Sequence, residues 1–359
     1  MRMRVRTARA AAAALGITAV LALIPGTATA DPAFVPDATD LVGTGSDTTQ
    51  DMMNALASGY NRRTPAPASR LASFDASGSA TIVPQSGCAA IARPNGSSAG
   101  IAALRADTTG CVEFARSSRG PSSSDGGLRF IPFAADAVSW VKAGTSNAPA
   151  ALSQAELRSI YTCAVTNWSQ VGGASAPIIP ILPNTASGTR SFFLSAIGVG
   201  TTPVTPGSCV VNGVRTNGTT IQENDARELT LALPAGGSAA NAVVPYSVAK
   251  YVFQGKPRPN NVERGSSVIG NIDPILGTDN ADPVTGTDPA TGASTERLNT
   301  AFVSRFRRTV FNVVELVGGS VPTKFAPVFG RGGYICSNAG DTVVRNQGFG
   351  ALAQTSCGY

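Results

Sequence analysis

Three short loops of small polar residues each lead directly into an apolar stretch with helical spacing. They are residues 45–49 (GSDTT), 96–100 (GSSAG) and 187–190 (SGTR). Apolar residues then recur three or four positions apart, as Met52, Leu56 and Tyr60 do after the first loop. The pattern predicts three helices, each with one buried face, whose N-termini lie in these loops.

Such loops suit a small anion. The first backbone N–H groups of a helix have no partner inside it, and the helix dipole places partial positive charge there. Small residues let an oxyanion approach these groups, and hydroxyls add further donors. Serine, threonine, aspartate and glycine are also ordinary N-cap residues, so a single loop of this kind would be structural. Three of them in a chain without histidine favour anion capture without chemistry.

The N-terminus indicates export. Arg2, Arg4, Arg6 and Arg9 precede an apolar run over 10–24, and small residues follow at 28–30. This pattern predicts a secretory signal over residues 1–30, and its apolar run is too short for a membrane span. No cysteine lies near the expected cut, which argues against a lipoprotein. A secreted or periplasmic location is therefore expected.

Charge and length exclude one class and suggest an architecture. The formal net charge of +6 falls to +2 without the four leader arginines, so a nucleic-acid role has little support. The 359 residues less the 30 of the leader leave 329, which suits two lobes better than one core.

The six cysteines are an even number, and export permits disulfides. Fifteen pairings are open, of which the local one joins Cys88–Cys111, Cys163–Cys209 and Cys336–Cys357. Metal binding is the weaker interpretation, because the chain has neither histidine nor a CxxC pair. No metal and no cofactor is expected.

Alternating patterns indicate an α/β fold. Strand-like apolar runs at 130–140, 178–182 and 242–245 alternate with helical segments that include 154–161 and 226–233. Residues 277–292, rich in Asp, Pro, Thr and Gly, are expected to form a surface loop. Its acids lack the spacing of a calcium loop.

Several motifs, in order and spacing, resemble the phosphate-binding protein of the high-affinity phosphate ABC importer. Residues 95–101 (NGSSAGI) resemble its G-S-S-G-G-V helix start, and 112–119 (VEFARSSR) resemble its V-D-F-G-A-S-D segment. The stretch from 152 to 168, with LSQAEL, IY and TNW, is similar to its L-T-x-x-Q-L-x-x-I-F-x-G-x-I-T-N-W segment, and 186–192 to its G-S-G-T-R-x-x-F loop. The likeness covers most of the chain after the leader.

The resemblance implies a type II periplasmic-binding-protein fold: two α/β lobes, a ligand cleft between them and a hinge that the chain crosses twice. Lobe one is expected to comprise residues 31–140 and 246–359, and lobe two 141–245. The implied ligand is inorganic phosphate or a similar small oxyanion, and the implied partners are permease subunits of an ABC importer. A monomer that is not an enzyme is expected.

Carried over position by position, the resemblance implies hydroxyl and N–H donors from both lobes. The expected ligand-binding residues are Ser46, Asp47, Thr48, Ser97, Ser117, Ser118, Arg119, Ser187, Gly188, Thr189 and Arg190.

Two positions depart from the family pattern. Pro183 stands where many members have an arginine, and Ser118 where some have an aspartate that accepts the proton of hydrogen phosphate. A fixed acceptor of this kind separates protonated phosphate from fully ionised sulfate. Asp47 is the hypothetical replacement for the acid, and Arg119 or Arg190 for the arginine.

Two classes of protein stay open beside the first class, anion transport: a secreted serine acyl hydrolase and a surface-binding protein. Residues 96–100 fit the G-x-S-x-G elbow of serine hydrolases, but a triad needs an imidazole that this chain lacks. Ser247 and Lys250 fit S-x-x-K, in which a lysine could activate a serine for acyl transfer. The third class is a secreted surface-binding protein that kept the fold and lost the transport role.

Overall fold

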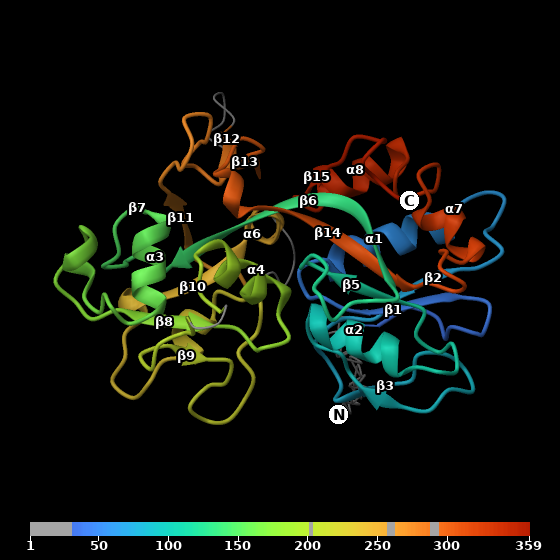
Figure 1. Ribbon diagram of the computed structural model, residues 1–359, viewed down its shortest axis with the longest axis horizontal. Helices are drawn as coiled ribbons and strands as arrows, with labels where there is room; N and C mark the ends of the chain where they lie inside the picture. Colours follow the sequence, from blue (N-terminus) through green and yellow to red (C-terminus); the bar gives the residue numbers. More distant parts are fainter. Residues whose placement is uncertain (1–30, 201–203, 257–262, 288–293) are drawn as a thin grey trace, which may run out of the picture.

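The computed structural model describes residues 31–200, 204–256, 263–287 and 294–359. The predicted secretory signal, residues 1–30, lies outside the described residues. Within them the chain forms two groups of strands and helices, joined by long strands that run between the groups (Figure 1).

One mixed sheet contains most of the strands. Its central order is β2-β1-β5-β14-β6-β10-β8-β9, with β11 and β15 also paired to β6 and with β7 paired to β11. The strands of this sheet are β1 (Leu41–Gly45), β2 (Leu71–Ser73), β5 (Phe114–Ser117), β6 (Leu128–Lys142), β7 (Ala151–Leu152), β8 (Ile179–Leu182), β9 (Val211–Asn212), β10 (Ala242–Ser247), β11 (Val268–Ile272), β14 (Arg307–Glu315) and β15 (Gly350–Ala351). Two small pairs lie outside it: β3 (Thr81–Ile82) with β4 (Ile91–Ala92), and β12 (Val284–Thr287) with β13 (Ser294–Leu298). The predicted α/β class is confirmed.

Helices begin where the three polar loops predict them. The α-helices are α1 (Gln50–Asn61), α2 (Ser97–Ala106), α3 (Gln154–Tyr161), α4 (Gly188–Ala196), α5 (Glu228–Leu231), α6 (Val248–Gln254), α7 (Ala326–Phe329) and α8 (Asn338–Asn346). Each of α1, α2 and α4 follows one loop and buries its apolar residues, which include Leu56 of α1, Ile101 of α2 and Phe193 of α4. Helix α3 has the predicted bounds and starts with a capping box between Ser153 and Glu156.

Two predictions from sequence need correction. The segment at 226–233 was expected to be a full helix, but α5 has only four residues, because the next residues enter a turn around Pro234. The segment at 277–292 was expected to be a loop, yet β12 lies within it and pairs with β13. Residues 288–292 of that segment lie outside the described residues.

Separate apolar cores support the two lobes. The first lobe is built around a core that includes Leu56, Phe114 and Val344, whereas the second is built around Trp140, Tyr161 and Phe193. A smaller cluster under α2 and another beside β2 extend the first lobe. Each lobe therefore excludes water from its own interior.

The chain passes between the cores along β6 and returns along β14, its antiparallel neighbour (Figure 1). On β6, Ala134 packs in the first core and Ala137 in the second. On β14, Val310 packs in the first core, whereas the preceding Phe306 packs in the second. Most buried apolar residues between 248 and 306 also pack in the second core, although the sequence placed the return at 246. We propose residue 307 as the return point.

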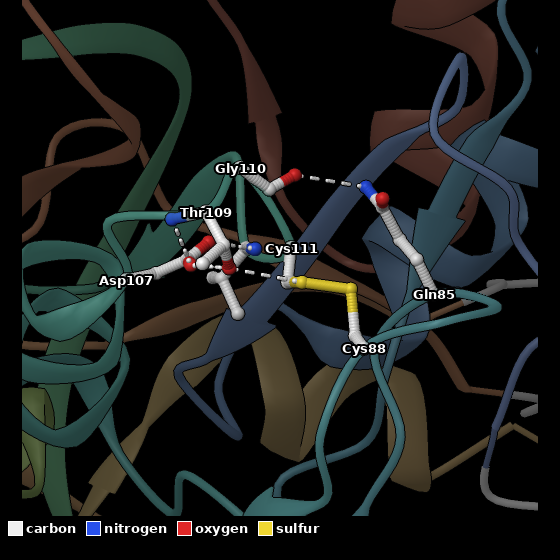
Figure 2. Close-up of a disulfide and its surroundings, with 7 residues drawn as sticks. Gln85, Cys88, Asp107, Thr109, Gly110 and Cys111 are labelled. Carbon is white, nitrogen blue, oxygen red and sulfur yellow. Dashed lines mark hydrogen bonds between the residues drawn. A yellow bond between two sulfur atoms is a disulfide. The ribbon is translucent and has the colours of Figure 1, made fainter.

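The six cysteines form the three local pairs. The S–S distances are 1.91 Å for Cys88–Cys111, 2.08 Å for Cys163–Cys209 and 1.96 Å for Cys336–Cys357. Figure 2 shows the first pair beside the Asp107 turn. Thr109 donates to the Asp107 carboxylate there, and Gln85 donates to the Gly110 carbonyl. This disulfide joins the loop before β4 to the loop that leads into β5.

Candidate functional site

Loops from both lobes meet where the lobes approach each other. Gly96, with a φ of 109°, lies against the loop before α4: a Cβ there would be 2.5 Å from the Ala186 carbonyl oxygen. A Cβ on Gly188 would lie 2.2 Å from the Ser97 hydroxyl oxygen and 2.3 Å from that of Ser118. The loops pack too closely at these two positions for any side chain.

Five hydroxyl groups gather at this junction, and we call them the hydroxyl cluster. Its members are Ser46, Thr48, Ser97, Ser118 and Thr189, all fully buried. The Ser118 hydroxyl oxygen lies 3.1 Å from that of Ser46 and 3.2 Å from that of Ser97. Across the lobes, the hydroxyl oxygens of Thr48 and Thr189 are 3.1 Å apart. All five were predicted as ligand-binding residues from the sequence.

Glu223 of the second lobe extends its carboxylate into the cluster, and it was not predicted. Its Oε1 accepts hydrogen bonds from the hydroxyls of Thr48 and Thr189, the latter at 2.9 Å. The Ser118 hydroxyl lies 3.5 Å from the same oxygen. The other oxygen, Oε2, is buried and has no hydrogen-bond partner among the described residues.

Arg308 supplies the guanidinium of the site. It faces Asp136 across the β14–β6 ladder, at the place where the two strands pass between the lobes. Its Nε and Nη2 donate to Asp136 Oδ2 at 3.0 and 2.8 Å. Nη2 also donates to the Thr189 hydroxyl at 3.0 Å, and Nη1 to the Ser118 carbonyl at 2.9 Å. The arginine thus touches a donor loop of each lobe.

The Asp136 carboxylate accepts hydrogen bonds from several groups. Besides Arg308 it accepts hydrogen bonds from the Ser247 hydroxyl at 2.8 Å and from the Ala249 N–H at 3.0 Å. The carboxylate therefore joins β6 to the N-terminus of α6. Because it neutralises Arg308, the cluster offers donors without an unpaired positive charge.

Asp47 lies beside the cluster and bonds elsewhere. Its carboxylate accepts a hydrogen bond from the Asn224 amide at 3.1 Å, and the same amide donates to the Thr48 hydroxyl at 3.0 Å. Burial raises the pKa of Asp47 to about 7, against the attraction of the Lys250 ammonium. Asn224 thereby connects the second lobe to the first polar loop.

The two arginines proposed from sequence are held by local partners. The Arg119 guanidinium donates to the Asp125 carboxylate at 2.7 Å and to the Ser98 hydroxyl at 3.1 Å. That of Arg190 donates to the Pro183 carbonyl at 2.9 Å. In this arrangement Arg308, rather than either of them, contacts the hydroxyl cluster.

The remaining predicted residues have structural partners. The Ser117 hydroxyl donates to the Arg119 carbonyl at 2.8 Å within its own turn. Ser187 caps α4 by accepting a hydrogen bond from the Arg190 N–H at 3.0 Å. Gly188 provides the close approach described above, and its N–H begins the helix.

Arg116 holds the first polar loop in place through hydrogen bonds. Its fully buried guanidinium donates to the carbonyls of Ser46 and Phe74 at 3.2 and 2.6 Å, and to the Ser73 hydroxyl at 2.8 Å. Burial lowers the pKa of this side chain to about 10, which leaves it protonated at neutral pH. A positive charge this close to the first polar loop favours an anion bound by that loop.

The S-x-x-K motif does not form a hydrolase dyad. The Ser247 hydroxyl donates to Asp136 and caps α6, accepting from the Lys250 N–H at 3.2 Å. The Lys250 ammonium donates to Asp51 at 2.5 Å. Burial opposes the charge of Lys250, but Asp51 and Asp47 outweigh it and raise its pKa. A lysine held protonated in this way is a poor general base.

The described residues contain neither a metal-binding cluster nor a membrane-spanning helix. Among them, no group of three or more His, Cys, Asp or Glu side chains could hold a metal ion. Within the same ranges, none of the helices has the length and apolar character needed to cross a bilayer.

Comparisons with known proteins agree on the architecture. The model of the PBP superfamily domain matches residues 27–273. A solved structure of a candidate phosphate ABC transporter substrate-binding protein with bound phosphate, from Clostridium perfringens, is 18% identical, with a TM-score of 0.56, over 88% of this chain and 100% of that one. An ABC-type phosphate transport receptor from Vibrio cholerae is also 18% identical, with a TM-score of 0.53, over 87% of this chain and 100% of that one. No curated protein matches the chain. At these identities the likeness to solved structures shows the fold, and neither structure is described as an enzyme.

Proposed function

The chain belongs to the PBP superfamily, and on that premise we propose that it captures inorganic phosphate, or a closely similar oxyanion, between its lobes for ABC-type import. The solved structures of the same fold are described as phosphate-transport proteins, which supports this choice of ligand. Permease subunits of an importer are the proposed partners, and a monomer outside the cytoplasm is the proposed form.

The observation that carries the proposal is the hydroxyl cluster with Arg308 beside it. Short hydroxyl side chains from two lobes converge with the N-terminus of α4 and a guanidinium. A tetrahedral oxyanion has acceptor sites on every side and can use such donors together. A hydrogen bond to a charged group contributes about 1.5–3 kcal/mol, so a few of them give tight binding.

Closure of the lobes completes the site in this proposal. Thr48 and Ser118 belong to the first lobe, and Thr189 to the second. The Ser98 N–H donates to the Ala186 carbonyl at 3.1 Å, which fastens the two sides next to the cluster. Closure removes water that would compete for the same donors, so each hydrogen bond becomes stronger.

The test is calorimetric titration with phosphate of the wild type and of Thr189→Val. Valine keeps the shape of threonine and removes the hydroxyl that lies between Thr48, Glu223 and Arg308. We expect saturable binding of one phosphate to the wild type and an affinity about 10- to 100-fold lower for the variant. Thr342→Val on α8, whose hydroxyl donates to the Asn338 carbonyl, is the control and should bind as the wild type does. A wild type that takes no phosphate, or a Thr189→Val that binds equally well, would contradict the proposal.

A further inference from the structure

We propose that Glu223 makes the site select oxyanions that still carry a proton, and that it does so from the second lobe. This inference rests on the proposed phosphate function and adds the residue that discriminates among anions. The sequence had suggested Asp47 for this role.

The position of Glu223 is the first argument. Its carboxylate is the acceptor for hydroxyls of both lobes, Thr48 and Thr189, and it lies beside Ser118. Arg308 donates to Thr189, and Thr189 donates to Glu223, so guanidinium, hydroxyl and carboxylate form one chain. An anion that uses these hydroxyls must therefore lie against the carboxylate.

The unused oxygen of Glu223 is the second argument. Glu223 is only 2% exposed, and its Oε2 has no hydrogen-bond partner among the described residues. A buried acceptor without a donor costs free energy, so a group that brings a donor is favoured there. Hydrogen phosphate brings an O–H, whereas sulfate has only acceptors. The same carboxylate thus accepts from one anion and repels the other.

Asp47 lacks these properties. Its carboxylate accepts a hydrogen bond from the Asn224 amide, and its main electrostatic partner is the Lys250 ammonium. No hydrogen bond joins its carboxylate to the hydroxyl cluster in the described structure. Asp47 and Glu223 are linked through Asn224, which donates to Thr48 as well. Asp47 therefore positions the first loop, while Glu223 meets the anion.

Selection would take place on closure. Glu223 belongs to the second lobe, and Thr48 and Ser118 belong to the first. An anion held by the first lobe alone would meet the carboxylate only when the lobes come together. An anion that cannot donate a proton would then oppose closure, because like charges without a shared proton cost several kcal/mol at short range.

The experiment compares phosphate with sulfate for the wild type and Glu223→Gln by calorimetric titration. At about pH 8 both are mostly dianions, and they differ in the proton that phosphate retains. The glutamine amide can donate to sulfate and is a weaker acceptor for the phosphate proton. We expect phosphate affinity to fall about tenfold and sulfate affinity to rise about tenfold, so that the ratio of phosphate to sulfate affinity drops about 100-fold.

Asp225→Asn is the matched control. It removes one negative charge two positions further along the same segment, and the Asp225 carboxylate pairs with Arg227. We expect its ratio of phosphate to sulfate affinity to match the wild type. An equal drop in both variants would mean that the general charge of the segment, and not the contact of Glu223, sets selectivity.

Other outcomes are equally decisive. If Glu223→Gln bound both anions more tightly by the same factor, the carboxylate would be only a competitor for the hydroxyls, and the inference would fail. The inference would fail too if the ratio of phosphate to sulfate affinity stayed constant for any other reason. If Glu223→Gln did not fold, Glu223→Asp would replace it: the shorter arm should weaken phosphate while sulfate stays excluded. A wild type that ignores phosphate would refute the proposed function itself, which is a different result.

Discussion

Replacing Arg308 by methionine should lower both the free energy of unfolding and the affinity for phosphate, for two different physical reasons. The substitution removes two hydrogen bonds from Asp136 and those to Thr189 and Ser118. It leaves the Asp136 charge buried, with the Ser247 hydroxyl and the Ala249 N–H as its remaining donors among the described residues. Breaking a buried ion pair from one side costs about 3–5 kcal/mol, and the remaining donors place our expectation near 3 kcal/mol.

The affinity change has a separate origin. Arg308 lies within hydrogen-bond distance of the Thr189 hydroxyl, where the proposed anion would be held. Loss of a charge-assisted hydrogen bond should weaken phosphate by about 1.5–3 kcal/mol, or about 10- to 150-fold. Urea unfolding without phosphate measures the first quantity, and calorimetry measures the second.

The double variant Arg308→Met with Asp136→Asn distinguishes the two effects. Asparagine carries no charge, so no lone buried ion remains. Its single amide oxygen can accept from the Ala249 N–H, and its amide N–H can donate to the Ser247 hydroxyl oxygen. We expect most of the lost free energy of unfolding to return while phosphate affinity stays low. If affinity recovered together with stability, Arg308 would act only through the fold and the reasoning about the site would be refuted.

Two further predictions concern the residues beside the cluster. The pKa of Asp47 is about 7 in the folded protein against an ordinary value of 3.8, so between these pH values the folded state keeps a proton that the unfolded chain releases. This stabilisation is complete below about pH 4 and is lost as the pH rises to about 7, and it amounts to up to about 4 kcal/mol. Asp47→Asn should flatten the pH dependence of urea unfolding over this window; an unchanged slope would show that Asp47 does not titrate there. Lys250→Met removes the partner of Asp51, which is a third exposed, and should cost about 1–2 kcal/mol of stability while phosphate affinity stays within about threefold of the wild type. A large loss of phosphate affinity, or loss of an ester-hydrolase activity shown by the wild type, would mean that Lys250 belongs to the functional site.

Local patterns explain why much of the architecture could be predicted. Small polar loops before periodic apolar residues mark helix N-termini, and α1, α2 and α4 begin there. The short separations within the cysteine pairs made the local disulfide pairing the simplest solution, and it is the one present. Hydroxyl residues in the same loops then meet, because the loops follow strands of one sheet or cap helices packed on it.

The charged residues of the site could not be found in this way. Glu223 and Thr48 are 175 positions apart, and Arg308 and Thr189 are 119 apart, so no local spacing relates them. One signal was present: Asp136 is an acid within an apolar strand, and a buried charge requires a partner. Conversely, Arg119 looked available from its place beside Ser118, but Asp125 only six positions away binds it.

The packing of the second lobe illustrates a further limit. Residues from 248 to 306 follow the return point that the sequence suggested, yet Tyr251, Ile269 and Phe302 pack in the second core. Their apolar character predicts burial but not the lobe in which they are buried. That choice depends on β11 and β14 pairing with β6, which is a contact between distant parts of the chain.

A crystal structure of the protein grown with phosphate would show the binding site itself. We expect one phosphate between the lobes, with its oxygens within hydrogen-bond distance of the Thr48, Ser118 and Thr189 hydroxyls and of the Arg308 guanidinium. One of its oxygens should also lie against the Glu223 carboxylate. A phosphate bound elsewhere, or lobes that meet with no anion between them at saturating phosphate, would refute the proposed binding site.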